Sequence, residues 1–182
     1  LLWTKPEKHD YMDVKGMEMA RRDNCKMQRD LQEEILQLIL TDDVAKAKQR
    51  VKDVVAEMLQ ARIDPSQLII TKKWSKPLDQ MLSPQAHVEL ALRMRKRDPG
   101  SAPQVGDRVP YVMVKMQKEP GKTEARAIDR AEDPLYVLHK GLVIDAKWYV
   151  DHQLKKMLVR IFGALDPPAS AWEAEQRKRG HI

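Results

Sequence analysis

The amino-acid sequence predicts a mainly α-helical domain with a few short strands, an α+β fold. Apolar residues recur at helical spacing between residues 25 and 61, and again between residues 145 and 165. Short apolar runs with β-branched residues, bounded by proline or glycine, lie between these two helical regions. The chain has 182 residues, 42% of them hydrophobic, which is enough for one domain with or without appended segments.

The first helical region reads as a pair of helices. Cys25–Leu40 carries apolar residues on one face, and Asp23 is a good N-cap residue for this helix. Asp43–Ala61 carries a second apolar stripe, with lysines and arginines on the other side. Because the connection between the two stretches is very short, we expect the helices to pack antiparallel.

The middle of the chain holds the segment around which we expect the rest to be organised. Leu68–Ile70 is typical of a short strand or extended link. Ser83–Pro84 reads as the start of a helix whose apolar face includes His87. Gly106–Asp107 then turns the chain into a strand over Val109–Met116. Cations crowd the last turn of the helix, where they suit the helix dipole: Arg93, Arg95, Lys96 and Arg97.

The last third of the chain contains one long amphipathic helix. Asp145 is the expected N-cap, and Pro167–Pro168 ends the helix. A turn is expected at Glu119–Lys122. The polar tail, residues 166–182, is expected to be disordered or loosely helical.

The charge balance suits an anionic partner. The formal net charge is +6, and duplex nucleic acid is the commonest such partner, although a merely soluble basic surface has the same composition. The single cysteine, Cys25, excludes an internal disulfide and a multi-cysteine zinc site within the sequence. No apolar run is long enough to cross a bilayer. The sequence starts without Met or a signal-peptide pattern, as we expect of a piece of a longer chain.

No residue pattern predicts a catalytic site. His87 lies on an apolar helix face, so we interpret it as a packed, hydrogen-bonded histidine and not as a metal ligand. Cys25 follows two arginines but has no neighbouring histidine, so we interpret it as a structural thiol. No glycine-rich phosphate loop is present. Helix capping or solvation explains the acidic pairs, which are Glu33–Glu34, Asp42–Asp43 and Glu132–Asp133.

Cations gather instead at the ends of the expected elements. At such ends, side chains and free backbone N–H groups can reach phosphates together. Lysine and arginine contacts to phosphates give salt-sensitive affinity that is independent of base sequence. A set of solvated charges would look the same in the sequence. The clusters are Arg21–Arg22, Lys72–Lys73, Arg93–Arg97, Arg108 and Lys115.

Several segments resemble motifs of the family B DNA polymerases. Lys15–Glu18 and Arg21–Cys25 are similar to the KG–RRDNC signature at the palm–thumb junction of that family. Ile63–Lys72 is similar to its "ID…L-ITK" segment. Gln85–Pro103 and Gly106–Val112 are most similar to the delta-type replicative members. The match continues in order through three shorter segments, Asp133–Tyr136, Tyr149–Leu154 and Arg160–Phe162.

The resemblance implies a division of the chain and a role for its cations. Residues 1–20 would be the end of the palm and the junction, residues 21–165 a polymerase thumb-like domain, and residues 166–182 a tail. In the family, the thumb grips primer–template duplex DNA behind the active site through the phosphate backbone and minor groove. By resemblance, the candidates for DNA contact are Arg22, Lys72, Arg93, Arg97, Arg108 and Lys115.

The resemblance also implies what the parent enzyme does. It would be a nuclear, DNA-directed DNA polymerase, a nucleotidyltransferase that uses Mg²⁺ and binds a sliding clamp and accessory subunits. The palm motifs with metal-binding aspartates and the metal-bound cysteine-rich C-terminus do not occur in this sequence. We therefore expect no cofactor and no polymerase activity in this segment alone. The alternative is a helical protein-interaction module, docking through Cys25–Leu40 and Asp43–Ala61, with a basic surface and no DNA role.

Overall fold

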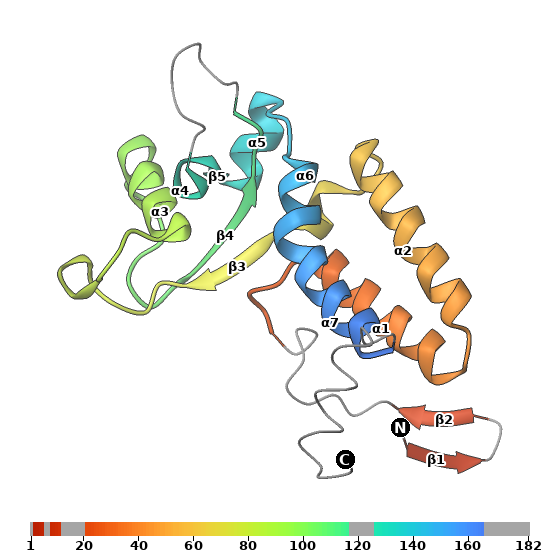
Figure 1. The fold of residues 1–182 in the computed structure, drawn as a ribbon. Helices are drawn as coiled ribbons and strands as arrows, with labels where there is room; N and C mark the ends of the chain where they lie inside the picture. The colour runs from red at the N-terminus through yellow and green to blue at the C-terminus, as the bar shows by residue number, and fades with distance from the viewer. Residues whose placement is uncertain (1, 6–7, 12–20, 117–125, 166–182) are drawn as a thin grey trace, which may run out of the picture.

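The computed structural model describes residues 2–5, 8–11, 21–116 and 126–165 (Figure 1). Most of the expected palm–thumb junction, the turn at Glu119–Lys122 and the tail at 166–182 lie outside the described residues. The helices and strands run in this order: β1 (Leu2–Lys5), β2 (Lys8–Tyr11), α1 (Lys26–Leu40), α2 (Val44–Leu59), η2 (Pro65–Leu68), β3 (Ile70–Lys73), η3 (Leu78–Gln80), α3 (Ala86–Arg97), β4 (Arg108–Met113), α4 (Ala127–Arg130), β5 (Ala131–Glu132), α5 (Pro134–Lys140), α6 (Ala146–Tyr149), η4 (Val150–Leu154) and α7 (Lys155–Leu165).

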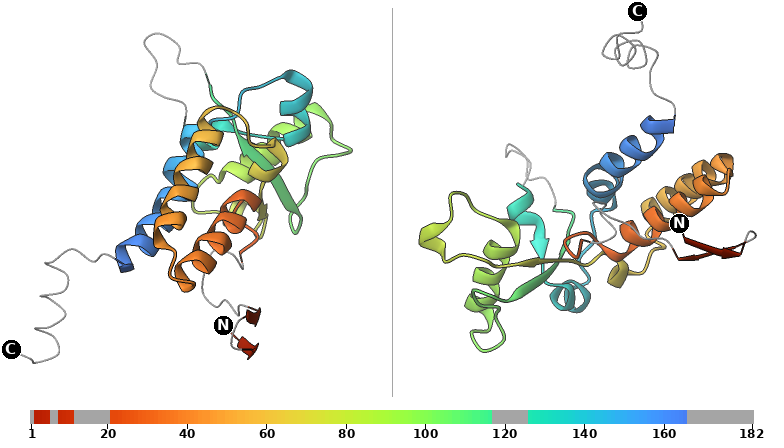
Figure 2. Two further views of the ribbon diagram at one scale, coloured as in Figure 1. Left: turned by 90° about the vertical axis from the view of Figure 1, so that its right-hand side faces the viewer. Right: turned by 90° about the horizontal axis from the view of Figure 1, so that it is seen from below.

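The described part is mainly helical with a small three-stranded antiparallel sheet, which confirms the predicted fold class. Helices α1, α2 and the continuous α6–α7 helix gather on one side, and the sheet with α3 lies on the other (Figures 1 and 2). One buried apolar cluster runs through both sides, because Ile35 and Met58 of the helices belong to the same cluster as Ile70 of the sheet and Leu90 of α3.

Helices α1 and α2 confirm the predicted pair, and they lie side by side and antiparallel (Figures 1 and 2). The side chain of Asp43 caps α2 by accepting the N–H of Lys46 at 3.0 Å. The predicted cap of α1 was wrong, because Cys25 and not Asp23 occupies the N-cap position, without a side-chain cap bond. Cys25 is fully buried in the main core, so packing fixes the start of this helix.

The sheet is built around β4, which pairs with β3 on one side and β5 on the other. The β3–β4 register runs from Ile70 opposite Tyr111 to Lys73 opposite Arg108. β4 is buried on both faces, since Tyr111 belongs to the main core and Val112 to a second, smaller one. The strand expected at Leu68–Ile70 instead begins at Ile70 and extends through Lys73, because this stretch has β4 as its hydrogen-bonding partner.

Of two other predicted helix starts, one is displaced and one is confirmed. Helix α3 begins at Ala86 with Gln85 in the N-cap position, so the start expected at Ser83–Pro84 was two residues early. Asp145 caps α6 as predicted, accepting the N–H of Trp148 at 3.0 Å. The long helix that follows contains a π-helical turn at Val150–Leu154.

A buried tyrosine links the helical side to the sheet. The hydroxyl of Tyr149 accepts the N–H of Met113 at 3.1 Å and donates to the carbonyl of Leu68 at 2.8 Å. Burial raises the pKa of this hydroxyl, so it stays protonated and can donate at neutral pH. The tyrosine thereby fixes η2 and β4 against the C-terminal helix, and this holds the start of β3 in place.

Candidate nucleic-acid interface

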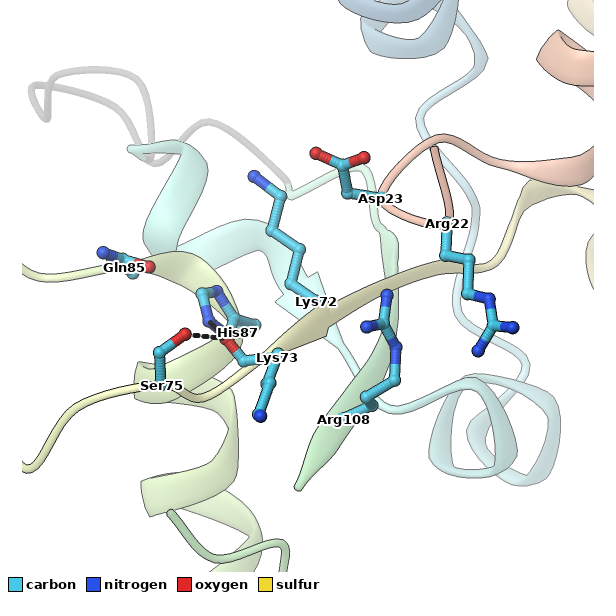
Figure 3. A pocket seen from close by; sticks show the side chains of 8 residues that line it. All are labelled: Arg22, Asp23, Lys72, Lys73, Ser75, Gln85, His87 and Arg108. Carbon is cyan, nitrogen blue, oxygen red and sulfur yellow. Dashed lines mark hydrogen bonds between the residues drawn. The ribbon is translucent and has the colours of Figure 1, made fainter. Parts of the chain in front are cut away.

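A cationic groove opens where the turn before α1 meets the exposed ends of β3 and β4 (Figure 3). Its volume is about 650 Å³. The side chains that line it come from four separate parts of the chain: Arg22, Asp23, Lys72, Lys73, Ser75, Gln85, His87 and Arg108.

The local structure explains why these side chains converge. Lys72 and Lys73 are the last two residues of β3, and Arg108 is the first of β4. The hydrogen-bonded ladder between β3 and β4 continues past these residues, beyond the bounds of the two strands. There the N–H of Trp74 donates to the carbonyl of Asp107 at 2.8 Å, and the N–H of Gly106 donates to the carbonyl of Trp74 at 2.7 Å. Gly106 has φ +102°, a backbone conformation that glycine adopts without strain.

The groove has an excess of positive charge. It contains four cations, Arg22, Lys72, Lys73 and Arg108, against the single carboxylate of Asp23, which leaves a net charge of +3 with His87 neutral. All four cations are exposed, and none of them forms an ion pair with another described residue. Arg108 donates one hydrogen bond, to the carbonyl of Thr71 at 3.3 Å. Lys73 and Arg108 lie directly opposite each other across the ladder, and like charges in this arrangement destabilise a sheet. A counter-charge from outside the chain would relieve that repulsion.

His87 lines the groove as a neutral, packed histidine. Its side chain is only 4% exposed, and its Nε2–H donates to the carbonyl of Lys73 at 3.3 Å. Burial lowers the pKa of His87, and the nearby charge of Lys72 lowers it further. The predicted role of a packed, hydrogen-bonded histidine is therefore confirmed, and the positive charge of the groove comes from lysine and arginine.

Arg93 and Arg97 of α3 lie outside the groove and bind other parts of the same chain. The guanidinium of Arg93 donates to the carbonyls of Ile128 and Ala131. Arg97 forms two hydrogen bonds with Glu132, at 3.0 and 2.7 Å, and lies 4.0 Å from the ring centroid of Tyr136. The hydrogen bonds that Arg97 donates to the carboxylate of Glu132 raise the pKa of Arg97. We call Arg93, Arg97 and Glu132 the α3–β5 clasp, because they join these two elements.

Lys115 lies beyond the far end of β4. Its side chain is exposed, and its backbone N–H donates to Val143 at 2.7 Å. It is seven positions from Arg108, a distance of about 23 Å along an extended chain. Of the six cations predicted to contact DNA, the structure thus brings together Arg22, Lys72 and Arg108. It adds Lys73, which the sequence marked only as the neighbour of Lys72.

The described residues offer little for other chemistry. Cys25 is buried, and burial raises the pKa of its thiol to about 11, so it is protonated at neutral pH, as expected of a structural cysteine. In the part of the chain that the structure describes, no three histidine, cysteine or acidic residues are arranged to hold a metal ion. Nor does any described helix combine the length and apolar character that a membrane span requires.

Comparison with known proteins shows one family. Residues 1–165 match the family model for DNA polymerase family B. The chain is 52% identical over 163 residues to the DNA polymerase delta catalytic subunit of Candida albicans, a match that covers 89% of this chain and 15% of that protein. The corresponding protein of Bos taurus is 47% identical over 163 residues, covering 89% of this chain and 14% of that protein.

A solved structure has a similar fold. The family B DNA polymerase from the hyperthermophilic archaeon Pyrobaculum calidifontis superposes with a TM-score of 0.61 and 29% identity, over 76% of this chain and 18% of that one. The chain therefore spans about one-seventh of the length of the curated relatives that it matches. With the family model matched from residue 1 to residue 165, the chain belongs to the family B DNA polymerases.

Proposed function

We propose that this chain is the thumb of a delta-type replicative DNA polymerase and that its cationic groove grips the sugar–phosphate backbone of primer–template duplex. The observation that carries the proposal is the meeting of Arg22, Lys72, Lys73 and Arg108 in one open groove without internal ion pairs among the described residues. Cations that are already exposed and form no ion pair lose little when they bind phosphates, and binding gains from the release of the counterions condensed on the DNA.

The polar neighbours of these cations also suit a phosphate backbone. Ser75 and Gln85 line the same groove and carry neutral hydrogen-bonding groups. Most protein–DNA hydrogen bonds go to phosphate and sugar, from cationic and neutral polar side chains alike, and they position the protein without reading the sequence. The proposed grip is therefore indifferent to base sequence, as a replicative polymerase requires.

The activity of the whole enzyme is part of the proposal. We infer a nuclear DNA-directed DNA polymerase, a nucleotidyltransferase that acts with Mg²⁺, a sliding clamp and accessory subunits. The described residues of this chain do not fit a Mg²⁺ site, since the groove carries one carboxylate and no acidic cluster occurs elsewhere in the described part. We therefore assign no catalytic step to this segment, and its role is to hold the duplex.

The salt dependence of binding tests the proposed function. Four phosphate contacts predict a slope of about −3.6 in a plot of log affinity against log salt, which is a loss of roughly 150-fold between 50 and 200 mM salt. The measurement is a fluorescence-anisotropy titration of labelled primer–template with the full 182-residue chain. Duplexes of different base sequence should bind equally well. Affinity that does not change with salt, or the absence of binding at 50 mM salt, would overturn the proposal.

A further inference from the structure

Among the described residues that line the cationic groove, Ser75 alone carries a hydroxyl. Its side chain is exposed, and its Oγ–H donates to the carbonyl of Lys73 at 3.4 Å, a long bond that leaves the oxygen accessible (Figure 3). Ser75 comes directly after Trp74, which is 2% exposed and whose indole N–H donates to the carbonyl of Lys76 at 2.7 Å. The buried tryptophan therefore fixes the hydroxyl at the edge of the groove, beside the cations.

The sequence around Ser75 has the charge pattern of a kinase substrate. Many serine kinases select substrates by basic side chains on the N-terminal side of the hydroxyl, which pair with acidic side chains of the kinase. Lys72 and Lys73 lie three and two positions before Ser75. Of the five serines in the sequence, Ser75 is the only one with lysine or arginine at both of those positions. Two cations of the groove therefore also mark the hydroxyl beside them for a basophilic kinase, one that selects basic sequences.

The backbone around Ser75 is accessible to such an enzyme. Lys72 and Lys73 are the last residues of β3, which lies at the edge of the described three-stranded sheet. Residues 75–80, which follow, are all exposed, and the loop that they begin projects from the body of the molecule (Figure 1). The two lysines and the hydroxyl are thus presented at the start of a surface loop, where enzymes reach a folded chain most readily.

A phosphate on Ser75 changes the charge of the groove. Phosphoserine carries about −1.5 to −2 charges at neutral pH and has three strong acceptor oxygens. The net charge of the groove is +3, so modification leaves roughly +1 to +1.5. The added group is also chemically like a DNA phosphate, so it pairs with the same cations. Lys73, two positions away on a flexible four-carbon stem, is the nearest of them in the sequence.

We propose that Ser75 is a phosphorylation site and that its phosphate releases the duplex from the cationic groove. This inference rests on the proposed function and adds regulation to the same site. In the modification, Oγ of Ser75 attacks the γ-phosphorus of ATP held by a basophilic serine kinase. A new O–P bond forms, the bond from that phosphorus to the β,γ-bridging oxygen breaks, and ADP leaves. The hydroxyl proton passes to the catalytic aspartate of the kinase.

Modification of the folded chain tests the first half of the inference. The full 182-residue chain is incubated with Mg²⁺-ATP and the catalytic subunit of cAMP-dependent protein kinase, a basophilic serine kinase, and modified residues are quantified by mass spectrometry. Ser75 should be the serine that is modified most. Ser83, which is exposed on the same loop but has no cation at the corresponding positions, should stay largely unmodified. Modification of other serines with Ser75 left unmodified would overturn the inference.

Duplex binding by the phosphorylated chain tests the second half. Because the phosphate offsets about two of the four cations, the salt slope should change from about −3.6 to about −1.8, with affinity roughly 60-fold weaker at 0.1 M salt. Treatment with a phosphatase should restore the salt slope and the affinity.

Each variant is compared with itself before and after kinase treatment, so its starting affinity does not enter the test. Ser75→Ala should bind duplex equally well before and after treatment, whereas Ser83→Ala should lose affinity as the wild type does. A loss of affinity that persists in Ser75→Ala would contradict the inference, because the responsible phosphate would lie elsewhere.

The outcomes separate this inference from the proposed function. If the unmodified chain shows the predicted salt slope and the chain phosphorylated at Ser75 binds equally well, the inference is overturned and the proposed function stands. If the unmodified chain does not bind duplex at 50 mM salt, both proposals are overturned.

Discussion

The cationic groove and the α3–β5 clasp are built from the same residue types but differ in what surrounds each cation. In the groove, four cations share one carboxylate and remain exposed. In the clasp, Arg93 is bound by two backbone carbonyls and Arg97 by both oxygens of Glu132. The side chain of Arg97 is 34% exposed and that of Glu132 only 11%.

The difference teaches that charge density alone does not identify a binding surface. A guanidinium whose donors are already used holds the protein together, and it is not available to neutralise a phosphate and release the counterions condensed on the DNA. The exposed groove cations form no ion pair with another described residue and are available, Arg108 through the donors that it does not use in its 3.3 Å bond to the carbonyl of Thr71. The two regions therefore should respond differently to substitution, with the groove changing DNA affinity and the clasp changing stability.

The largest expected effect is on DNA affinity when two groove cations are removed. Lys72→Ala/Arg108→Ala should reduce the salt slope from about −3.6 to about −1.8 and weaken binding roughly 60-fold at 0.1 M salt. The control is Lys46→Ala/Lys52→Ala, which removes the same charge from exposed positions on α2. It should leave the salt slope and the duplex affinity nearly unchanged. Equal losses in the two double variants would mean that net charge, and not the groove, determines binding.

The clasp should show the opposite pattern. Arg97→Ala leaves the carboxylate of Glu132 with little access to water, so we expect unfolding free energy to fall by about 1–2 kcal/mol while the salt slope of DNA binding stays the same. Urea denaturation of the full chain measures the unfolding free energy. Arg97→Lys keeps the charge but not the two-bond geometry and should restore only part of the loss. A reduced salt slope in either variant would place Arg97 at the DNA after all.

The histidine beside the groove cations should make the stability of the chain depend on pH. Because the pKa of His87 is lowered in the folded chain, the unfolded chain binds a proton that the folded chain does not. Stability is therefore complete above the unfolded pKa of about 6.5 and is lost as pH falls through the folded pKa, by at most about 1.4 kcal/mol per pH unit.

Thermal denaturation between pH 7.5 and 5 measures this dependence. His87→Gln should flatten the pH profile, although it lowers stability at pH 7.5, and His152→Gln, at an exposed position, should leave the profile as it is. A wild-type stability that rises as the pH falls below 6.5 would contradict the assignment of His87 as a neutral packed histidine.

The smallest expected effect is a gain in stability. Lys73→Thr removes one of two like charges that face each other across the β3–β4 ladder and introduces a residue that favours strands. We expect unfolding free energy to rise by about 0.5 kcal/mol while duplex affinity falls. If the variant is less stable, the lysine supports the sheet and is not there for an external partner.

Local sequence signals predicted much of the helical side. Asp43 and Asp145 cap the helices that their positions indicated. An N-cap carboxylate needs only the free backbone N–H groups of the turn that follows it, so the local sequence is enough to predict it. Helix α5 was missed although its signals were present: Asp133 caps it and Gly141 ends it in the left-handed region. Its short length left too few residues for a helical periodicity.

The sheet and the groove depend on contacts that are distant in the sequence. Lys72 and Arg108 lie 36 positions apart and meet because β3 pairs with β4 in one register. Arg97 looks in the sequence like the other cations of α3, and its partner Glu132 lies 35 residues away. Clusters of cations in the sequence could therefore indicate candidates for DNA contact. Only the register of the sheet shows which of these cations lie in the groove and which lie in the clasp.

Protection of individual lysines from acetylation by bound duplex tests the central claim most directly. The full chain is treated with an amine-acetylating reagent with and without primer–template at low salt, and modification is quantified by mass spectrometry at each lysine. We predict strong protection of Lys72 and Lys73, with Lys46 and Lys52 on α2 modified equally in both samples. Equal modification of Lys72 and Lys73 with and without duplex, or protection centred on α2, would contradict the account.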